Sequence, residues 1–329
     1  MTHSRRDVLV GACGAAVGSA AGLSAAPAQA YAPQAGRQAP GFYRYKVGAV
    51  EITAVTDGQV SFPLGDKFVT NVPKADVSKA LEEAHLAPDQ ITIVFTPIVV
   101  NTGSKLVVID TGYGPGNLEK TNGASGQFHN NLGAAGIDRG AVDAVVISHF
   151  HADHINGLLT ADGKPAFANA EILVPAKEWA FWMDDGAMSR APEQQKAGFA
   201  NVRRVFDALG RKVAQYDGAR DVVPGITPIQ TNGHTPGHVS YTIASADAAL
   251  LVTSDLTNRP ELFLRHPGWY AMFDMDPKMA EAARRKSFDM AVAEKMLVQG
   301  FHYPFPAAGY VEKEGDGYRL TPAPWKGTL

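Results

Sequence analysis

Residues 149–154 read His-Phe-His-Ala-Asp-His and directly follow the apolar run 144–147. Three imidazoles and a carboxylate this close together are typical of a site for a borderline ion such as Zn²⁺. After an extended segment, residues i and i+2 point to the same side, so His149 and His151 can meet one ion. If Asp153 begins a helix, Asp153 and His154 turn toward a second ion. The alternative is a chance cluster of surface histidines.

Three further polar residues follow apolar segments later in the chain. His234 lies in the loop Asn-Gly-His-Thr-Pro-Gly-His, whose Gly and Pro residues mark a tight turn, and Asp255 and His302 each follow a strand-like run. Taken singly, each is more often a cap or a solvated loop residue. Because α/β proteins place their sites at strand ends, the order of these residues after the first motif predicts that they complete a two-metal site.

Together these residues resemble the full ligand set of dinuclear hydrolases with the metallo-β-lactamase fold. In chain order the set is His149, His151, Asp153, His154, His234, Asp255 and His302. The resemblance implies that one ion binds His149, His151 and His234. It implies that the other binds Asp153, His154 and His302, and that Asp255 bridges the two. The expected cofactor is therefore a pair of divalent metal ions, with Zn²⁺ the expected metal.

From Gly41 to the C-terminus the chain resembles one branch of this superfamily, that of bacterial methyl parathion hydrolase and related lactonases. The segments that carry the resemblance are GFYRYKVGAVEITAVTDG, VNTGSKLVVIDTG, ISHFHADHINGL, NGHTPGHVSY and the YPFP stretch after His302. Residues 257–276, TNRPELFLRHPGWYAMFDMD, depart from the organophosphate hydrolase. This region follows Asp255, and in the family it would form part of the pocket wall. The resemblance therefore implies the family's metal chemistry for this chain but does not imply its choice of substrate.

The resemblance implies a hydrolase that uses a metal-bridging hydroxide. Two neighbouring divalent ions lower the pKa of a shared water and polarise the group that is attacked, so no Ser or Cys nucleophile is needed. Asp255 or Asp153 is the expected proton acceptor, and the sequence does not decide between them. The expected small-molecule substrates are uncharged esters, lactones or organophosphate triesters, with N-acyl homoserine lactones as the alternative. A periplasmic metal-binding module is the alternative that is not an enzyme.

Other members of the superfamily fit less well. A class B β-lactamase usually has Cys where Asp255 stands, and the diiron oxygen-reductase branch replaces a histidine of the first motif by Glu. A nuclease would need a basic surface, whereas the formal net charge is -3. We therefore expect no nucleic-acid partner. Many relatives are homodimers, but no interface can be read from the sequence.

Three residues are candidates for orienting the metal ligands, because a ligand histidine usually donates its other N–H to an acceptor. Asp110 ends a strand-like run, and in the family its counterpart orients ligand groups; the alternative is a plain turn former beside Gly112. His238 and Asp57 are either orienting residues or ordinary loop contacts. His85, His129 and His266 show no partner pattern, so the sequence predicts that they face solvent.

Aromatic residues are the candidates for lining a substrate pocket. Trp182 falls where the methyl parathion hydrolase branch has a pocket tryptophan, and Phe199 lies near a similarly placed phenylalanine. Trp179 and Phe273 are further candidates, although aromatic side chains are normally core. An apolar cleft would select uncharged aromatic esters, lactones or phosphotriesters.

The N-terminal segment has the sequence pattern of an export signal. Ser-Arg-Arg-Asp from Ser4, a weakly apolar run to Ala26 and an Ala-Gln-Ala ending at Ala30 predict a twin-arginine export signal over residues 1–30. The alternative is a disordered or membrane-anchoring segment. We expect a periplasmic or secreted protein with a flexible leader over 31–40 and one domain over 41–329. No 18-residue apolar run follows the N-terminus, so no membrane span is predicted.

The pattern of elements fits the α+β class and the αββα sandwich of the family, in which two mixed β-sheets pack between outer helices. A hairpin is predicted at Asp57-Gly58, and a helical pattern over 72–92. The expected strands are 91–100, 105–110 and 144–147, and 310–321 predicts a closing hairpin around residues 315–317. The expected helices are 128–135, 176–184, 193–209 and 277–297.

Overall fold

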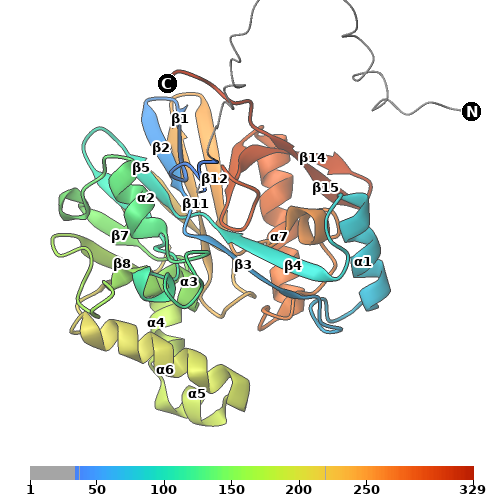
Figure 1. Ribbon diagram of the computed structural model, residues 1–329, viewed down its shortest axis with the longest axis horizontal. Coiled ribbons are helices and arrows are strands. Elements are labelled where there is room, and N and C mark those ends of the chain that lie inside the picture. The colour runs from blue at the N-terminus through green and yellow to red at the C-terminus, as the bar shows by residue number, and fades with distance from the viewer. Residues whose placement is uncertain (1–33, 37, 219) are drawn as a thin grey trace, which may run out of the picture. The chain divides into compact units, whose positions relative to one another are not determined.

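Two β-sheets lie face to face at the centre of the structure (Figure 1). The structure is a computed structural model that describes residues 34–36, 38–218 and 220–329. The export signal predicted for residues 1–30 lies outside the described residues, as do parts of the predicted leader. Residues 39–329 form one compact unit.

The first sheet has seven strands and is mixed. Its antiparallel half is β1–β2–β5–β6 and its parallel half is β6–β7–β8–β9. The strands are β1 (Phe42–Val47), β2 (Val50–Val55), β5 (Ile98–Asn101), β6 (Leu106–Ile109), β7 (Ala144–Val146), β8 (Glu171–Pro175) and β9 (Ala214–Tyr216). All of β7 is buried, which explains why its sequence is uniformly apolar.

The second sheet has six strands, and its only parallel pair is β12–β13. The strands are β10 (Ile226–Gln230), β11 (Val239–Ser245), β12 (Ala248–Ser254), β13 (Leu297–Gly300), β14 (Ala308–Glu314) and β15 (Gly317–Pro322). The parallel pairing brings the ends of β12 and β13, and so Asp255 and His302, to the same edge. The closing hairpin predicted for 310–321 is confirmed as β14–β15.

Helices cover the outer faces of the two sheets (Figure 1). The α-helices are α1 (Lys74–Glu83), α2 (Phe128–Ala134), α3 (Ala152–Ile155), α4 (Ala176–Trp182), α5 (Asp185–Arg190), α6 (Glu193–Ala208) and α7 (Pro277–Ala293). Of these, α1 packs in a separate apolar cluster with residues 91–95 and 262–263, and α5 packs against α4 and α6. One apolar cluster fills the space between the sheets, a second packs α2 and α6 on the seven-stranded sheet, and a third packs α7 on the other. The predicted αββα sandwich is confirmed. No helix in the described ranges is long and apolar enough to cross a membrane.

The hairpin predicted at Asp57-Gly58 is wrong. β2 pairs with β1 and β5, whereas β3 (Gly58–Pro63) pairs with β4 (Gln90–Phe95) in a separate two-stranded sheet. Gly58 has a φ of +97°, and a Cβ there would lie 2.0 Å from the carbonyl oxygen of Ala124. The glycine therefore serves a close approach between two chain segments and not a hairpin turn.

Three predicted elements are divided or shorter in the structure. The strand predicted over 91–100 is β4 and β5, which belong to different sheets, because Thr96-Pro97 interrupts the ladder. The helix predicted over 72–92 ends at Glu83, and a turn leads into β4. The last predicted helix likewise ends at Ala293, where Lys295 takes a positive φ before β13.

Candidate metal centre

All seven predicted ligands lie together at one end of the two sheets. His149, His151, Asp153 and His154 come from the segment that leads from β7 into α3. His234 comes from the loop between β10 and β11, and Asp255 and His302 directly follow β12 and β13. The centre therefore depends on the packing of one sheet on the other.

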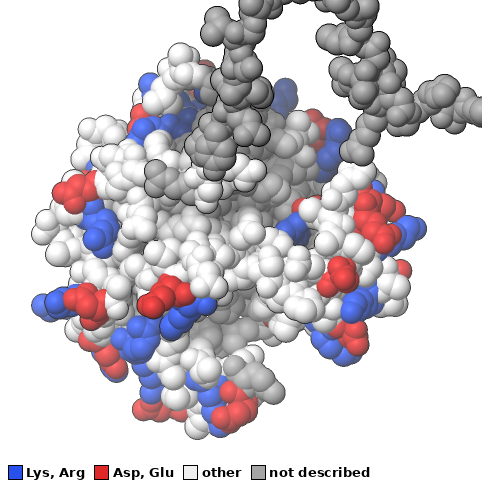
Figure 2. Space-filling view, viewed as in Figure 1, with Lys and Arg blue, Asp and Glu red and all other residues white. Residues whose placement is uncertain are grey.

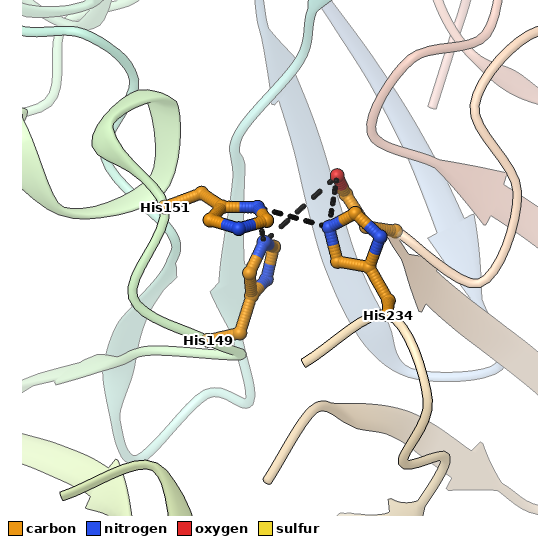
Figure 3. Close-up of side chains that lie close together, drawn as sticks. His149, His151 and His234 are labelled. Atoms are coloured by element: carbon orange, nitrogen blue, oxygen red, sulfur yellow. Dashed lines mark hydrogen bonds and ion pairs between the residues drawn. The ribbon is translucent and has the colours of Figure 1, made fainter. Parts of the chain in front are cut away.

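The first group consists of three imidazoles that face a common point (Figure 3). His151 Nδ1 lies 3.0 Å from His149 Nε2 and 2.9 Å from His234 Nε2. Asp255 Oδ2 completes the group at 3.2 Å from His234 Nε2. This is the geometry of side chains that share one cation.

The second group consists of Asp153, His154 and His302. Asp153 Oδ2 lies 3.5 Å from His154 Nε2 and 3.7 Å from His302 Nε2. Asp255 faces this group as well, with Oδ1 at 3.1 Å from His154 Nε2 and Oδ2 at 3.0 Å from His302 Nε2. Asp255 thus lies between the two groups, where the predicted bridging ligand should be.

The ring nitrogens that face away from the centre have acceptors. His154 Nδ1 lies 2.8 Å from Asp110 Oδ2, and His302 Nδ1 lies 2.8 Å from the carbonyl oxygen of Val94. A histidine that donates from Nδ1 keeps the Nε2 lone pair free for a cation. These contacts select the tautomer that a metal ligand needs.

The residues fit two divalent cations. His154 Nε2 and Asp255 Oδ1 are buried and face each other at 3.1 Å, yet within the described ranges neither makes a hydrogen bond of normal geometry. Burial would lower the pKa of His234, but the carboxylates of Asp255 and Asp274 outweigh it and raise the pKa to about 9. Cations would neutralise these carboxylates in place of a proton, and zinc suits a donor set of imidazole and carboxylate.

Two of the predicted orienting residues support ligands. Asp110 holds His154, and its carboxylate also accepts hydrogen bonds from the backbone N–H and the hydroxyl of Ser148, at 2.8 and 2.7 Å. His238 Nε2 accepts the backbone N–H of Asp255 at 3.0 Å. Burial lowers the pKa of His238 to about 3, so its ring stays neutral and able to accept.

Of the two roles that the sequence left open for Asp57, the structure shows the loop contact. Its buried carboxylate accepts hydrogen bonds from the backbone N–H groups of Tyr113, Gly126 and Phe128, at 2.9, 3.2 and 2.9 Å. It therefore holds the loop that joins β6 to α2 and contacts no metal ligand directly. Burial raises the pKa of Asp57 to about 7, against the effect of these three donors.

Sequence reasoning missed Glu178, a fully buried carboxylate on α4. It accepts hydrogen bonds from the hydroxyl of Thr235, from Gly237 N at 2.8 Å, from Trp182 Nε1 at 2.6 Å and from Phe150 N at 3.3 Å. Glu178 thus joins the loop of His149 and His151 to the loop of His234. The only sequence signal was a charged residue in the apolar stretch ILVPAKEWAFW.

Sequence reasoning also missed Asp274, which lies in the divergent region 257–276. Its Oδ1 lies 3.0 Å from His234 Nδ1, and its Oδ2 lies 3.3 Å from a guanidinium nitrogen of the buried Arg284. The guanidinium also donates to the carbonyl oxygens of Leu256 and Pro267, at 2.9 and 2.7 Å. Asp274 therefore orients His234, and Arg284 fixes Asp274.

A cavity of about 530 Å³ opens onto the metal centre. We call its ligand side the floor, formed by His151, Asp153, His234, Asp255 and His302. We call its apolar side the wall, formed by Val60, Phe62, Ile93, Phe95, Met272 and Phe273. The wall comes from the β3–β4 pair and from the divergent region. In Figure 2, charged groups of both signs are interspersed around the rim of the face shown.

The aromatic predictions need correction. Phe273 lines the cavity as predicted, but Trp182, Phe199 and Trp179 do not line it among the described residues and belong to the core. The Trp182 indole points its N–H at Glu178, and Phe199 packs 4.7 Å from the Trp182 ring. Trp182 therefore supports the floor from beneath, through Glu178 and through its ring contact with His151 at 6.3 Å between centroids.

Two of the remaining histidines are not simply exposed. His129 is half-buried, with Nε2 at 2.8 Å from the carbonyl oxygen of Gly157, and burial lowers its pKa to about 4. His266 stacks on Trp269 with ring centroids 4.2 Å apart. His85 is exposed, as predicted.

Residues 96–298 match the model of the metallo-beta-lactamase superfamily. The chain belongs to this superfamily. Among solved structures it is similar to AidC, a dizinc quorum-quenching lactonase in complex with the product N-hexanoyl-L-homoserine, with 25% identity over 87% of this chain and 99% of AidC and a TM-score of 0.80. It is also similar to the hydrolase AbOPH, with 26% identity over 88% of this chain and 100% of AbOPH and a TM-score of 0.80.

Among curated proteins, the chain is similar to an N-acyl homoserine lactonase from a Bacillus species, with 29% identity over 47% of this chain and 53% of the relative. An N-acyl homoserine lactonase of Bacillus thuringiensis matches with 27% identity over the same shares. The chain thus spans about half the length of the curated relatives that it matches.

Proposed function

We propose that this protein is a dinuclear metal-dependent hydrolase that opens lactones, with N-acyl homoserine lactones as the first substrates to consider. The observation that carries this proposal is the floor of metal ligands at the base of an apolar cavity of about 530 Å³. The similarity to AidC and to the Bacillus lactonases supports lactones as the class of substrate.

When bound, two divalent cations supply an activated water and polarise the attacked carbonyl group. The chain's own residues position this chemistry. The wall excludes water and binds the apolar part of the substrate, while Asp255 faces both ligand groups. Asp153 and Asp255 are the carboxylates that line the cavity, and we assign them the transfer of the proton from the attacking water to the leaving alkoxide oxygen.

Hydrolysis of organophosphate triesters is the second candidate, because the wall suits any uncharged substrate. The test is a comparison of kcat/KM for an acyl homoserine lactone, dihydrocoumarin and methyl parathion on protein that contains two metal ions per chain. We expect the first lactone to be the best substrate. Two bound metals without turnover of any of the three would contradict the proposal and favour a metal-binding module.

We also propose that residues 1–30 direct twin-arginine export, on the support of Arg5-Arg6 and the Ala28-Gln29-Ala30 ending alone. Fractionation of expressing cells tests this. The native chain should be found outside the cytoplasm, and the double variant Arg5→Lys, Arg6→Lys should be retained in the cytoplasm. Equal distribution of the two would refute export by this route.

A further inference from the structure

The cavity contains few polar side chains apart from the metal ligands. Among the described residues that line it, two are polar and are not metal ligands: Tyr113 and Asn258. In a mostly apolar pocket, a small number of polar groups fix the orientation of the ligand. These two residues are therefore the candidates for recognising a polar group of the substrate.

Asn258 is the stronger candidate because its side-chain oxygen Oδ1 is buried without a hydrogen-bond partner among the described residues. Only 9% of the residue is exposed, and its Oδ1 has no hydrogen-bond partner in the described part of the chain. Buried polar groups in folded proteins are nearly always hydrogen-bonded, so an orphan amide beside a cavity needs an explanation. A bound ligand would provide the missing partner.

The neighbours of Asn258 hold its backbone in place. The Thr257 hydroxyl lies 2.7 Å from the hydroxyl of Tyr303. Arg259 forms an ion pair with Glu261 at 2.7 Å and donates to the carbonyl oxygen of Thr92 on β4. Asn258 therefore lies between two anchored residues, and its side chain is presented to the cavity three positions after Asp255.

We infer that Asn258 binds the secondary amide of an N-acylamino lactone and makes the enzyme selective for substrates that carry this amide. The inference rests on the proposed lactonase function and adds to it the residue that sets specificity. The primary amide of Asn offers one acceptor and two donors. Its Oδ1 can accept the N–H of the substrate amide, while the acyl oxygen of this trans amide points the opposite way. Methyl parathion has no N–H to offer, so Oδ1 would stay unpaired.

The test uses two lactones that share the ring and the chain length, one with the N-acyl amide and one with an alkyl chain instead. The variant Asn258→Leu keeps the number and branching of the side-chain heavy atoms and has no polar atoms. We expect kcat/KM for the amide lactone to fall by about 10- to 100-fold, mainly through KM, as is typical when a site loses a hydrogen bond to substrate. The value for the alkyl lactone should change by less than about threefold.

Controls separate recognition from damage to the fold. Two metal ions per chain and an unchanged unfolding midpoint in Asn258→Leu show that the floor is intact. Equal losses on both lactones would overturn the inference, because Asn258 would then only support the shape of the cavity. A selective loss in Tyr113→Phe but not in Asn258→Leu would also overturn it and assign amide recognition to Tyr113.

A binding measurement distinguishes failure of this inference from failure of the proposed function. Calorimetry of the metal-loaded protein with N-hexanoyl-L-homoserine needs no turnover. About tenfold weaker binding to Asn258→Leu than to the wild type is expected, and equal binding contradicts the inference. If the wild type binds this compound but cleaves neither lactone, the proposed lactonase function fails, and with it the selectivity assigned to Asn258.

Discussion

The floor and the wall of the cavity lie side by side, but different interactions hold them. Each floor histidine that has an orienting contact receives it from a different element, as His302 does from the carbonyl oxygen of Val94 and His234 from Asp274. The wall residues Phe62 and Phe95 instead pack in an apolar cluster with α1 and residues 262–263. Hydrogen bonds have strict geometry, whereas apolar packing accepts changes of shape at modest cost.

This difference predicts that the chemistry and the choice of substrate respond to different substitutions. Changes in the floor or its supports should alter metal content and turnover together. Changes in the wall should alter KM and leave metal content unchanged. Five predictions test this separation, from the largest expected effect to the smallest.

Asp255→Ala should have the largest effect, because this carboxylate faces both ligand groups. We expect the metal content to fall below two per chain and kcat/KM to fall on the order of a thousandfold or more, since a catalytic metal contributes several kcal/mol. Elemental analysis and steady-state kinetics measure this. A variant that keeps both metals and full activity would show that Asp255 does not bridge.

Glu178→Gln should destabilise the fold by about 2–4 kcal/mol. The carboxylate accepts hydrogen bonds from the N–H groups of Gly237 and Trp182, whereas the NH₂ group of Gln is itself a donor and leaves some of them unpaired. An unpaired buried donor costs free energy of folding. Urea unfolding followed by circular dichroism gives the free energy of unfolding. Glu312→Gln is a control in the exposed ion pair with Arg319, where we expect a change below about 1 kcal/mol.

Asp274→Ala should lower metal affinity or activity by about 10- to 100-fold, the usual cost of losing a partner of a ligand histidine. The reason is that His234 loses the acceptor of its Nδ1 proton. Competition with a chelator measures the affinity. Asp274→Asn keeps an oxygen acceptor, so its metal affinity should lie between those of the wild type and the Ala variant. If it loses as much affinity as the Ala variant, the negative charge of Asp274, and not its hydrogen bond, supports His234.

Asp57 should make stability depend on pH. Burial raises its pKa to about 7 from its ordinary value of 3.8, so the folded chain binds this proton more tightly than the unfolded chain. The resulting stability is fully present below pH 3.8 and is lost as the pH rises through 7. Unfolding free energies between pH 4 and 8 should therefore fall more steeply in the wild type than in Asp57→Asn. Parallel curves would mean that Asp57 is ionised throughout.

Phe62→Leu should have the smallest effect. Phe62 is a half-buried residue of the wall, and a shorter apolar side chain there leaves the floor unchanged. We expect KM to change by a few fold and kcat and metal content to stay constant, as for a loss of uniform binding. A fall in metal content would break the separation between floor and wall.

Much of the site could be predicted from the sequence, because metal ligands need particular side chains in a particular order. The seven ligands and Asp110 were predicted correctly as a group that meets in space. The supports Glu178 and Asp274 could not be predicted in this way. The partners of such a carboxylate lie on segments that are distant in sequence, so no fixed spacing in the chain marks it.

The sandwich architecture also followed from the resemblance and from the pattern of strands and helices, but the pairing of strands near the cavity did not. Asp57-Gly58 has the sequence of a hairpin turn, yet Asp57 receives backbone hydrogen bonds from residues 113–128 and β3 pairs with β4. Local preference for a turn was outweighed by tertiary hydrogen bonds. The pairing of β3 with β4 also places their apolar side chains in the wall of the cavity.

What the sequence determined by itself was the chemistry of the floor, because the identity and order of His and Asp residues limit which ions can bind. What only the tertiary structure decided was the surface that meets the substrate. Trp182 and Phe199 turned into the core, while Phe62 and Asn258 came to the cavity. The physical reason is that an aromatic or amide side chain suits a core and a pocket equally well, and only the packing of the sheets and loops around it determines where it lies.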